Sequence, residues 1–313
     1  EMQRSLVGSE MCIRDRRGCM ISIILILLFV FSVLSVPVCH GVISGLYLYG
    51  MKIFPGLFIS FILTNILVRI LQQKNINNPW ILVITGLMTG FPNGAYICSW
   101  YNKNNPENRL GDMLAGIINI PSPAFLISYV YINILEKCIS LPMFLALTYT
   151  PVILCSYMAI LLFRDKDNKK DNAPHIKNDK KLIFHFFEEA VDSSINTALK
   201  LGAYVIIFSV IVNIIMHFSQ SNTAGLLISY LFEISNGLAI IKNAGIPMNI
   251  TVLLTVLLDA FGGVCIIMQT KSICSSYISI KKYIYQKLVL CIVTLAMTYL
   301  CLLYTSDAAD DKA

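Results

Sequence analysis

Long apolar stretches separated by short polar segments run along almost the whole chain of 313 residues. Several of them approach the ~20 residues that a helix needs to cross a lipid bilayer. They are 21–38, 53–71, 80–98, 110–135, 141–163, 199–218, 226–241, 251–270 and 288–300. The pattern predicts an all-α polytopic membrane protein with the lipid bilayer as its first partner.

Four of these stretches are interrupted by glycine, proline or polar residues where a membrane helix should continue. The interruptions lie at 90–94, 119–123, 233–237 and 259–263. Unpaired backbone N–H and C=O groups are costly in hydrocarbon, so irregular backbone persists there only where protein or a water-filled cavity covers it. Two such pairs, one in each half of the chain, are typical of transporters whose solute site lies between broken helices.

The loop lysines and arginines decide between two topologies. If all nine stretches cross, basic residues are spread over both sides, against the usual asymmetry. If 80–98 and 226–241 are re-entrant hairpins, the loop basic residues gather on one side, except Lys52, Lys137 and Lys242. The hairpins then enter from opposite faces, which makes the halves an inverted repeat. The expected cytoplasmic loops are 72–79, 101–109, 164–181 and 271–287, the last ending at Lys287.

The same topology divides the chain into two halves, 17–163 and 182–300. A linker at 164–181, rich in Lys, Asp and Asn, reads as a solvated cytoplasmic loop between them. At the start of the second half, 182–198 shows apolar residues at helical spacing opposite acidic ones. This predicts an amphipathic helix that lies either in the membrane interface or against the bundle.

The two ends of the chain do not fit the pattern of apolar stretches in either half. Segments 11–16 and 301–306 can be encoded by one DNA sequence read in opposite orientations, and both ends resemble translated sequencing-adapter sequence. We therefore interpret 1–16 and 301–313 as non-native segments, with Met20 as the expected natural start.

Residues at the four interruptions form the candidate solute site. Glycine permits close backbone approach, proline stops helices, and a helix that restarts after a break offers N–H groups and a positive dipole end to a polar or anionic solute. Single glycines often serve helix packing, but the matched order favours function. The candidate substrate-binding residues are Gly90, Pro92, Asn93, Gly94, Asn119, Ser122, Glu233, Ser235, Asn236, Gly237, Gly262, Gly263 and Gln269.

Two acidic residues, Glu233 and Asp259, lie in apolar surroundings. Burying either one ionised costs about 2.5–3.5 kcal/mol on the membrane-insertion scale. Each is therefore a candidate for proton or ion coupling. The alternative is architectural: a carboxylate can cap the free N–H groups of a broken helix.

The absence of several sequence motifs reduces the range of possible functions. The chain has no Gly-x-x-x-x-Gly-Lys-Ser/Thr loop for ATP, no Gly-x-Ser-x-Gly elbow and no Cys-x-x-Cys pair. The four histidines are widely separated, and the basic residues crowd into loops. We expect no enzyme activity, cofactor, metal or nucleic-acid partner. Transport would be secondary or facilitative. The sequence leaves open whether the protein forms a homo-oligomer.

Several motifs together resemble the sporulation integral membrane proteins that carry nucleoside-recognition (Gate) domains. The resemblance spans about 51–289. It rests on 54–58 (FPGLF), 86–95 (GLMTGFPNGA), 119–125 (NIPSPAF), 202–208 (GAYVIIF), 233–237 (EISNG) and 261–269 (FGGVCIIMQ). The chain departs slightly from the family: Thr89 and Phe91 replace a usual serine and tyrosine, and Ser235 replaces a threonine.

The resemblance implies a fold similar to concentrative nucleoside transporters, with two re-entrant hairpins and two broken transmembrane helices. It also implies a role in endospore formation in a bacterial cell membrane, with the outer forespore membrane as one candidate. Movement of dipicolinate, a small aromatic dicarboxylate, is the suggested activity. We therefore expect a carrier of a small polar or anionic solute. The alternative is a non-transporting scaffold or regulator of spore-envelope assembly.

Overall fold

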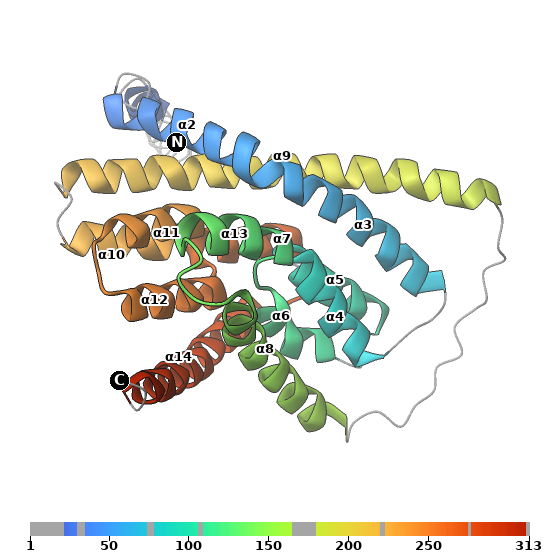
Figure 1. Cartoon of the computed structure of the whole chain (residues 1–313). Coiled ribbons are helices and arrows are strands. Elements are labelled where there is room, and N and C mark those ends of the chain that lie inside the picture. The colour runs from blue at the N-terminus through green and yellow to red at the C-terminus, as the bar shows by residue number, and fades with distance from the viewer. Residues whose placement is uncertain are drawn as a thin grey trace, which may run out of the picture.

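The computed structural model describes residues 22–29, 35–73, 78–105, 109–164, 180–219, 223–274 and 277–310, and every regular element within them is a helix (Figure 1). Segment 1–16 and most of the linker 164–181 lie outside these residues. By length and composition, five helical segments among these described residues can cross a membrane. They are Leu110–Ile134, Leu141–Leu162, Phe187–Phe218, Met248–Cys274 and Ile280–Leu302. The bent pair Val36–Ile53 and Leu57–Leu67 makes up to six. The predicted all-α class is therefore confirmed, and the apolar helices are compatible with a membrane protein.

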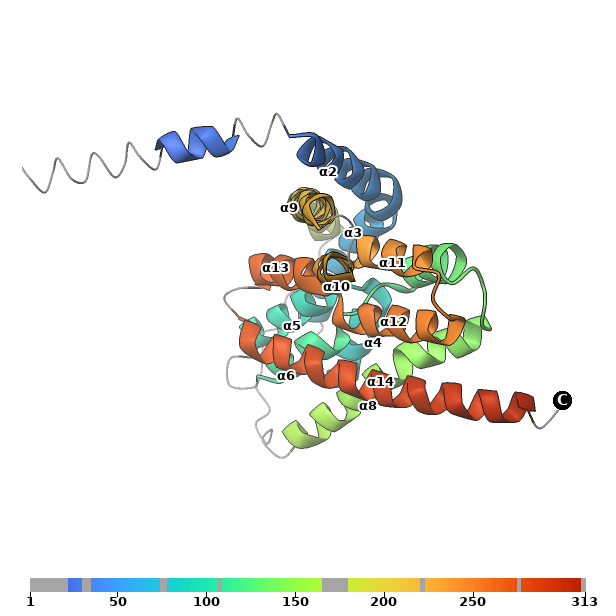
Figure 2. The ribbon, with the colours of Figure 1, turned by 90° about the vertical axis from the view of Figure 1, so that its left-hand side faces the viewer.

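The helices form three layers (Figures 1 and 2). The first contains α2 (Val36–Tyr47), the π-helical η1 (Leu48–Ile53), α3 (Phe54–Gln73) and α9 (Lys180–Phe218). The opposite layer contains α8 (Leu141–Arg164) and α14 (Ile280–Asp310). Between them lie α4 (Pro79–Thr89), α5 (Asn93–Asn104), α6 (Leu110–Ile118), α7 (Pro123–Phe125), η2 (Leu126–Ile134), α10 (Thr223–Phe232), α11 (Ile234–Asn243), α12 (Met248–Phe261) and α13 (Gly263–Cys274).

The middle layer owes its short helices to the predicted interruptions. Helices end and restart at 90–92, at 119–122, at Glu233 and at Gly262. Gly262 adopts φ +83°, a left-handed conformation that glycine reaches without a Cβ clash. All four breaks predicted from the sequence are therefore present in the backbone.

The predicted amphipathic segment 182–198 is not a separate helix. It forms the first part of α9, which runs unbroken for 39 residues. Ala190, Ser194 and Ala198 are buried, and Asn65 of α3 donates a hydrogen bond to the Ser194 hydroxyl at 3.1 Å. This part of α9 therefore packs against the bundle, which is one of the two placements that the pattern allowed.

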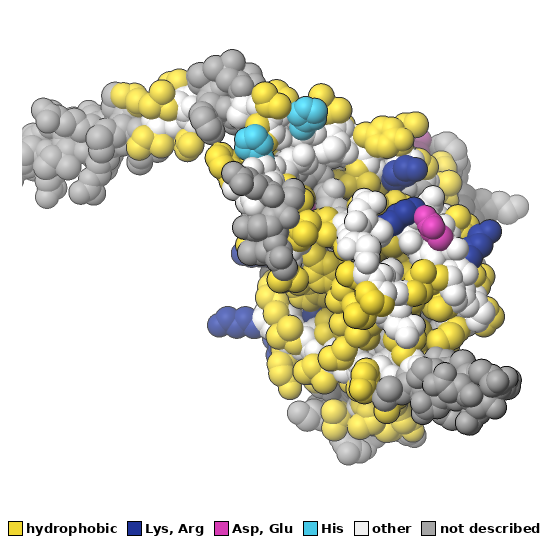
Figure 3. Space-filling view, turned by 60° about the vertical axis from the view of Figure 1, so that its left-hand side comes forward, with side chains coloured by type: hydrophobic (Ala, Val, Ile, Leu, Met, Phe, Trp, Pro, Cys, Tyr) yellow, Lys and Arg dark blue, Asp and Glu magenta, His cyan; other side chains and the backbone are white. Residues whose placement is uncertain are grey.

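Close approach of backbones holds the first layer together. A Cβ added at Gly41 of α2 would lie 2.5 Å from the Cα atom of Val210 in α9, so no larger residue fits there. Small residues at such crossings allow membrane helices to pack tightly. Large apolar side chains remain on the outside of the molecule, as Figure 3 shows for one face. Such an apolar surface suits a lipid environment.

Two predicted loops are shorter than expected. α5 continues to Asn104, into the predicted loop 101–109, and α14 begins at Ile280, well inside the predicted loop 271–287. α14 also continues as far as Asp310, so helix extends into the segment 301–313 that the sequence set apart. The sequence ended α5 too early and began α14 too late because a few lysines in a helix look like loop composition.

Candidate functional site

The two breaks of the first half are hydrogen-bonded to each other. The Phe91 N–H donates to the Ile120 carbonyl at 2.8 Å, and the Ala95 N–H donates to Asn119 Oδ1 at 3.3 Å. The Asn119 side chain therefore satisfies a free N–H group at the start of α5. Gly90 adopts φ +72°, and a Cβ there would lie 2.4 Å from a backbone nitrogen of the second break. The two breaks fit together only because this residue is glycine.

In the second half, the third break is stabilised by its own acidic residue. The Glu233 carboxylate accepts hydrogen bonds from the N–H groups of Ser235 at 3.1 Å and Asn236 at 2.8 Å. Glu233 is thus the N-cap of α11, the architectural role that the sequence left open. The breaks also meet in this half, because a Cβ at Gly263 would lie 3.2 Å from the Phe232 carbonyl oxygen.

At three breaks, side chains of the protein accept hydrogen bonds from part of the restarted helix. Asn119 accepts from α5, Glu233 accepts from α11, and the Ser122 hydroxyl accepts from the Phe125 N–H of α7 at 3.4 Å. These helix starts therefore offer a solute fewer free N–H groups than the sequence predicted, and binding through the remaining ones stays a prediction.

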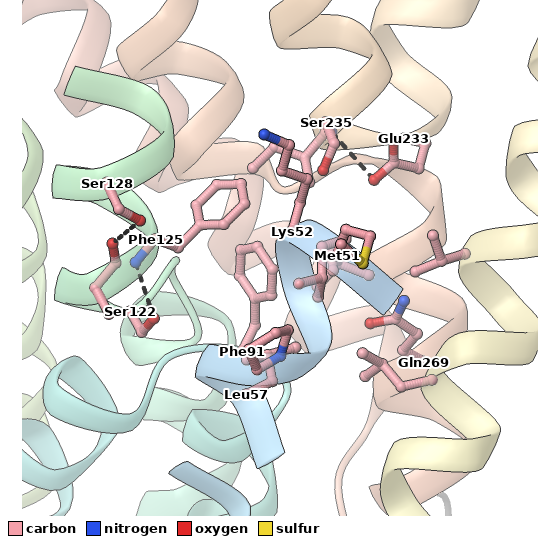
Figure 4. A pocket seen from close by; sticks show the side chains of 17 residues that line it. Met51, Lys52, Leu57, Phe91, Ser122, Phe125, Ser128, Glu233, Ser235 and Gln269 are labelled. Atoms are coloured by element: carbon pink, nitrogen blue, oxygen red, sulfur yellow. Dashed lines mark hydrogen bonds between the residues drawn. The ribbon is translucent and has the colours of Figure 1, made fainter. Parts of the chain in front are cut away.

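A cavity of about 260 Å³ lies between the two halves and below η1 and α9 (Figure 4). Its walls include residues at the first three breaks and residues of α13, the helix that follows the fourth. The lining residues are Met51, Lys52, Ile53, Pro55, Leu57, Phe91, Ser122, Ala124, Phe125, Ser128, Leu201, Val205, Glu233, Ile234, Ser235, Ile266 and Gln269.

The cavity wall is mostly apolar, with a few polar groups available for binding. Ser235 Oγ and Gln269 Oε1 are buried and have no hydrogen-bond partner among the described residues. Buried polar atoms are normally paired, so these two are suited to bind a ligand. Lys52 adds a positive charge to the wall. The rings of Phe91 and Phe125 lie 6.5 Å apart between their centroids. The site therefore combines apolar area, hydrogen-bonding groups and one cation.

Four of the sequence-predicted site residues line this cavity: Ser122, Glu233, Ser235 and Gln269. The others shape the breaks without lining it, and they are Gly90, Pro92, Asn93, Gly94, Asn119, Asn236, Gly237, Gly262 and Gly263. The sequence analysis missed Lys52, Phe125 and the wall residues of α9. The motif 54–58 was a signal for this region, but it carried no polar side chain that pointed to a site.

Lys287 forms a second polar centre that the sequence placed wrongly in a loop. It lies one to two turns inside α14 and is completely buried. Its ammonium donates to the carbonyl oxygens of Asn119 and, at 2.8 Å, of Ala260. These residues lie at the C-terminal ends of α6 and α12, where carbonyl groups lack helical partners. One ammonium group therefore donates a hydrogen bond to a carbonyl at the end of each of these two broken helices.

Asp259 directly precedes Ala260, one of the two residues whose carbonyls bind Lys287, and it does not line the cavity. It is completely buried in the last turn of α12. Neither carboxylate oxygen has a hydrogen-bond partner among the described residues. Asp259 therefore does not act as a helix cap, in contrast to Glu233.

The described residues form an all-helical fold with long apolar helices, compatible with an integral membrane protein, and paired helix breaks beside an internal cavity. Comparisons of the chain with protein-family models, curated proteins and solved structures found no match.

Proposed function

We propose that the protein is a secondary or facilitative carrier that moves a small polar or anionic solute across a membrane, and that the cavity is its solute site. The observation that carries the proposal is the origin of the cavity wall. Residues at three helix breaks and in the helix after the fourth line one space together with η1 and α9. Irregular backbone at membrane depth is tolerated where it lines such a cavity.

The wall chemistry supports a small solute with an apolar body and polar or anionic groups. Phe91 and Phe125 offer ring surfaces, Ser235 and Gln269 offer unpaired polar atoms, and Lys52 offers a positive charge. Dipicolinate, which the family resemblance suggests, has this chemistry and is the first solute to test. Endospore formation is the corresponding biological setting.

We also propose that α4–α5 and α10–α11 are the two re-entrant hairpins of an inverted repeat. These helices have 11, 12, 10 and 10 residues. At about 1.5 Å per residue, each reaches only about 15–18 Å, well short of a ~30 Å hydrocarbon core. Across the third break, a Cβ at Gly237 would lie 2.7 Å from the Tyr230 carbonyl oxygen, as expected where α11 folds back on α10.

Cysteine labelling tests this topology. Single cysteines introduced at 101–105 and at 180–182, in a background without reactive native thiols, should react with an impermeant reagent from the same side of the membrane. A cysteine replacing Lys242 should react from the other side. Labelling of the first two segments from opposite sides would exclude the hairpin arrangement.

Flux into liposomes tests the carrier function. The reconstituted protein should take up labelled dipicolinate or a nucleoside faster than empty vesicles, with saturation. Gln269→Leu should reduce uptake about fivefold, because losing a hydrogen bond to the solute costs on the order of 1 kcal/mol. Thr148→Val is a matched control, since Thr148 bonds the Phe144 carbonyl of its own helix and does not line the cavity. The absence of flux for every solute tested would contradict the proposal.

A further inference from the structure

Two buried carboxylates of the second half have different surroundings. Glu233 has both oxygens bonded to N–H groups, whereas both oxygens of Asp259 are unpaired among the described residues. Asp259 is 0% exposed, so bulk water does not solvate it either. An ionised carboxylate in such a place is strongly disfavoured, and a buried carboxyl of this kind is expected to be neutral.

Titratable groups face Asp259 from two neighbouring helices. Tyr149 of α8 and Tyr230 of α10 are close enough to interact electrostatically with it. The Tyr230 hydroxyl donates to the Leu254 carbonyl at 2.8 Å, while the Tyr149 hydroxyl is buried without a partner among the described residues. On α14, Cys291 interacts with Tyr230 and with Lys287 rather than with Asp259. None of these side chains forms an ion pair with Asp259 in the described part of the chain.

The local electrostatics favour a proton over a metal cation at Asp259. The carboxyl lies in the last turn of α12, where the negative end of the helix dipole repels an anion. A metal cation would also need several ligands, and no group of three or more His, Cys, Asp or Glu side chains in the described part of the chain could hold one. A bound proton removes the charge of the carboxylate and requires no additional oxygen ligands.

We propose that Asp259 is the proton-coupling carboxyl of the carrier. It holds a proton in the buried conformation described. When the break at Gly262 opens to water, the carboxyl O–H bond breaks, the electron pair stays on the carboxylate and the proton passes to a water molecule. Its release and return drive the uphill movement of the solute. The coupling rests on the proposed carrier function, whereas the protonated state does not.

Infrared difference spectroscopy of the purified full-length protein tests the protonated state directly. The C=O stretching band of a protonated, buried carboxyl should be present in the wild type and lost in Asp259→Asn. Glu233→Gln is the matched control and should leave that band in place. If Asp259→Asn does not fold, isotope-labelled aspartate in the wild type should shift the band. A band that neither change affects would overturn the proposal.

Transport in liposomes separates the coupling from the carrier function. Wild-type protein should accumulate solute under a proton gradient and also exchange it without one. Asp259→Asn should keep exchange within about twofold and lose gradient-driven accumulation. Unchanged accumulation in Asp259→Asn would overturn the coupling and leave the carrier function intact. The absence of wild-type exchange would overturn the carrier function and the coupling with it, and the infrared result would still decide whether Asp259 binds a proton.

Discussion

The two pairs of helix breaks differ in the side chains that lie beside their unpaired backbone groups. In the first half, the side chains at the breaks are neutral, and the broken backbone is satisfied by the Asn119 side chain, the Ile120 carbonyl and the ammonium of Lys287 from the other half. In the second half, an acidic residue lies at each break, and only Glu233 has hydrogen-bond partners. The comparison indicates that the first pair is a fixed structural element. The second pair holds the groups whose charge can change.

The largest expected effect tests the fit of the first pair. Gly90→Ala should destabilise the protein by several kcal/mol, because its Cβ would overlap backbone of the second break and its φ of +72° is unfavourable. Gly245→Ala is the matched control. Gly245 has φ +62° but open space around it, so only the backbone penalty of about 1–2 kcal/mol should remain. Thermal unfolding in detergent measures both, and equal losses would show that the contact between the breaks contributes nothing.

The second largest expected loss of stability concerns Lys287, whose ammonium binds carbonyl groups of both halves. Lys287→Met should cost about 2–4 kcal/mol, because two buried carbonyl groups lose their donor. Lys282→Met provides the comparison. The Lys282 side chain is half exposed and pairs with Asp112 at 3.3 Å, so its loss should cost less than about 1 kcal/mol. A similar midpoint shift for both variants in chemical denaturation would argue against Lys287 as a link between the halves.

A smaller effect distinguishes the two acidic residues. Glu233→Gln should lower stability by about 1 kcal/mol, since an amide oxygen is a weaker cap than a carboxylate. Asp259→Asn should leave stability nearly unchanged, because the carboxylate oxygens have no partner to lose. Denaturant midpoints of the two variants decide this. A larger loss for Asp259→Asn would show that this carboxyl has a structural role after all.

The smallest expected effect concerns an ion pair at the protein surface. Lys242 binds Glu136 at 2.7 Å, and its hydrogen bond and charge lower the pKa of Glu136. Because the pKa is lower in the folded protein, the contribution of this pair is present above the usual pKa of glutamate and is lost as the pH falls through the lowered value. In an NMR titration of labelled glutamate, Lys242→Met should return the Glu136 pKa toward its usual range. An unchanged titration would exclude the pairing in solution.

Much of the fold could be predicted from the sequence because its determinants are local. Clusters of glycine, proline and polar residues at 90–94, at 119–123 and at 259–263 favour helix ends, so these breaks were visible without a structure. The continuity of α9 was harder to recognise, because its first part is amphipathic and its second part apolar. No glycine or proline lies at the boundary between the two parts. That absence was the sequence signal that the helix continues.

The site could be predicted only in part because its remaining determinants are contacts between distant segments. Ser122, Glu233, Ser235 and Gln269 were found because polar residues next to breaks are conspicuous. The partnership of Asn119 with Ala95 joins residues 24 apart, and that of Lys287 with Asn119 joins residues 168 apart. No local pattern marks Lys287 as buried, since it follows Lys281 and Lys282 in the sequence.

The position of Lys287 restricts which parts of the molecule can move. Because one side chain is bonded to the ends of both α6 and α12, separating these helices would leave carbonyl groups exposed in a dry interior. We therefore expect α6, α12 and α14 to travel as one rigid unit. Access to the cavity would then alternate through displacement of η1, α3 and α9, whose residues cover its other side.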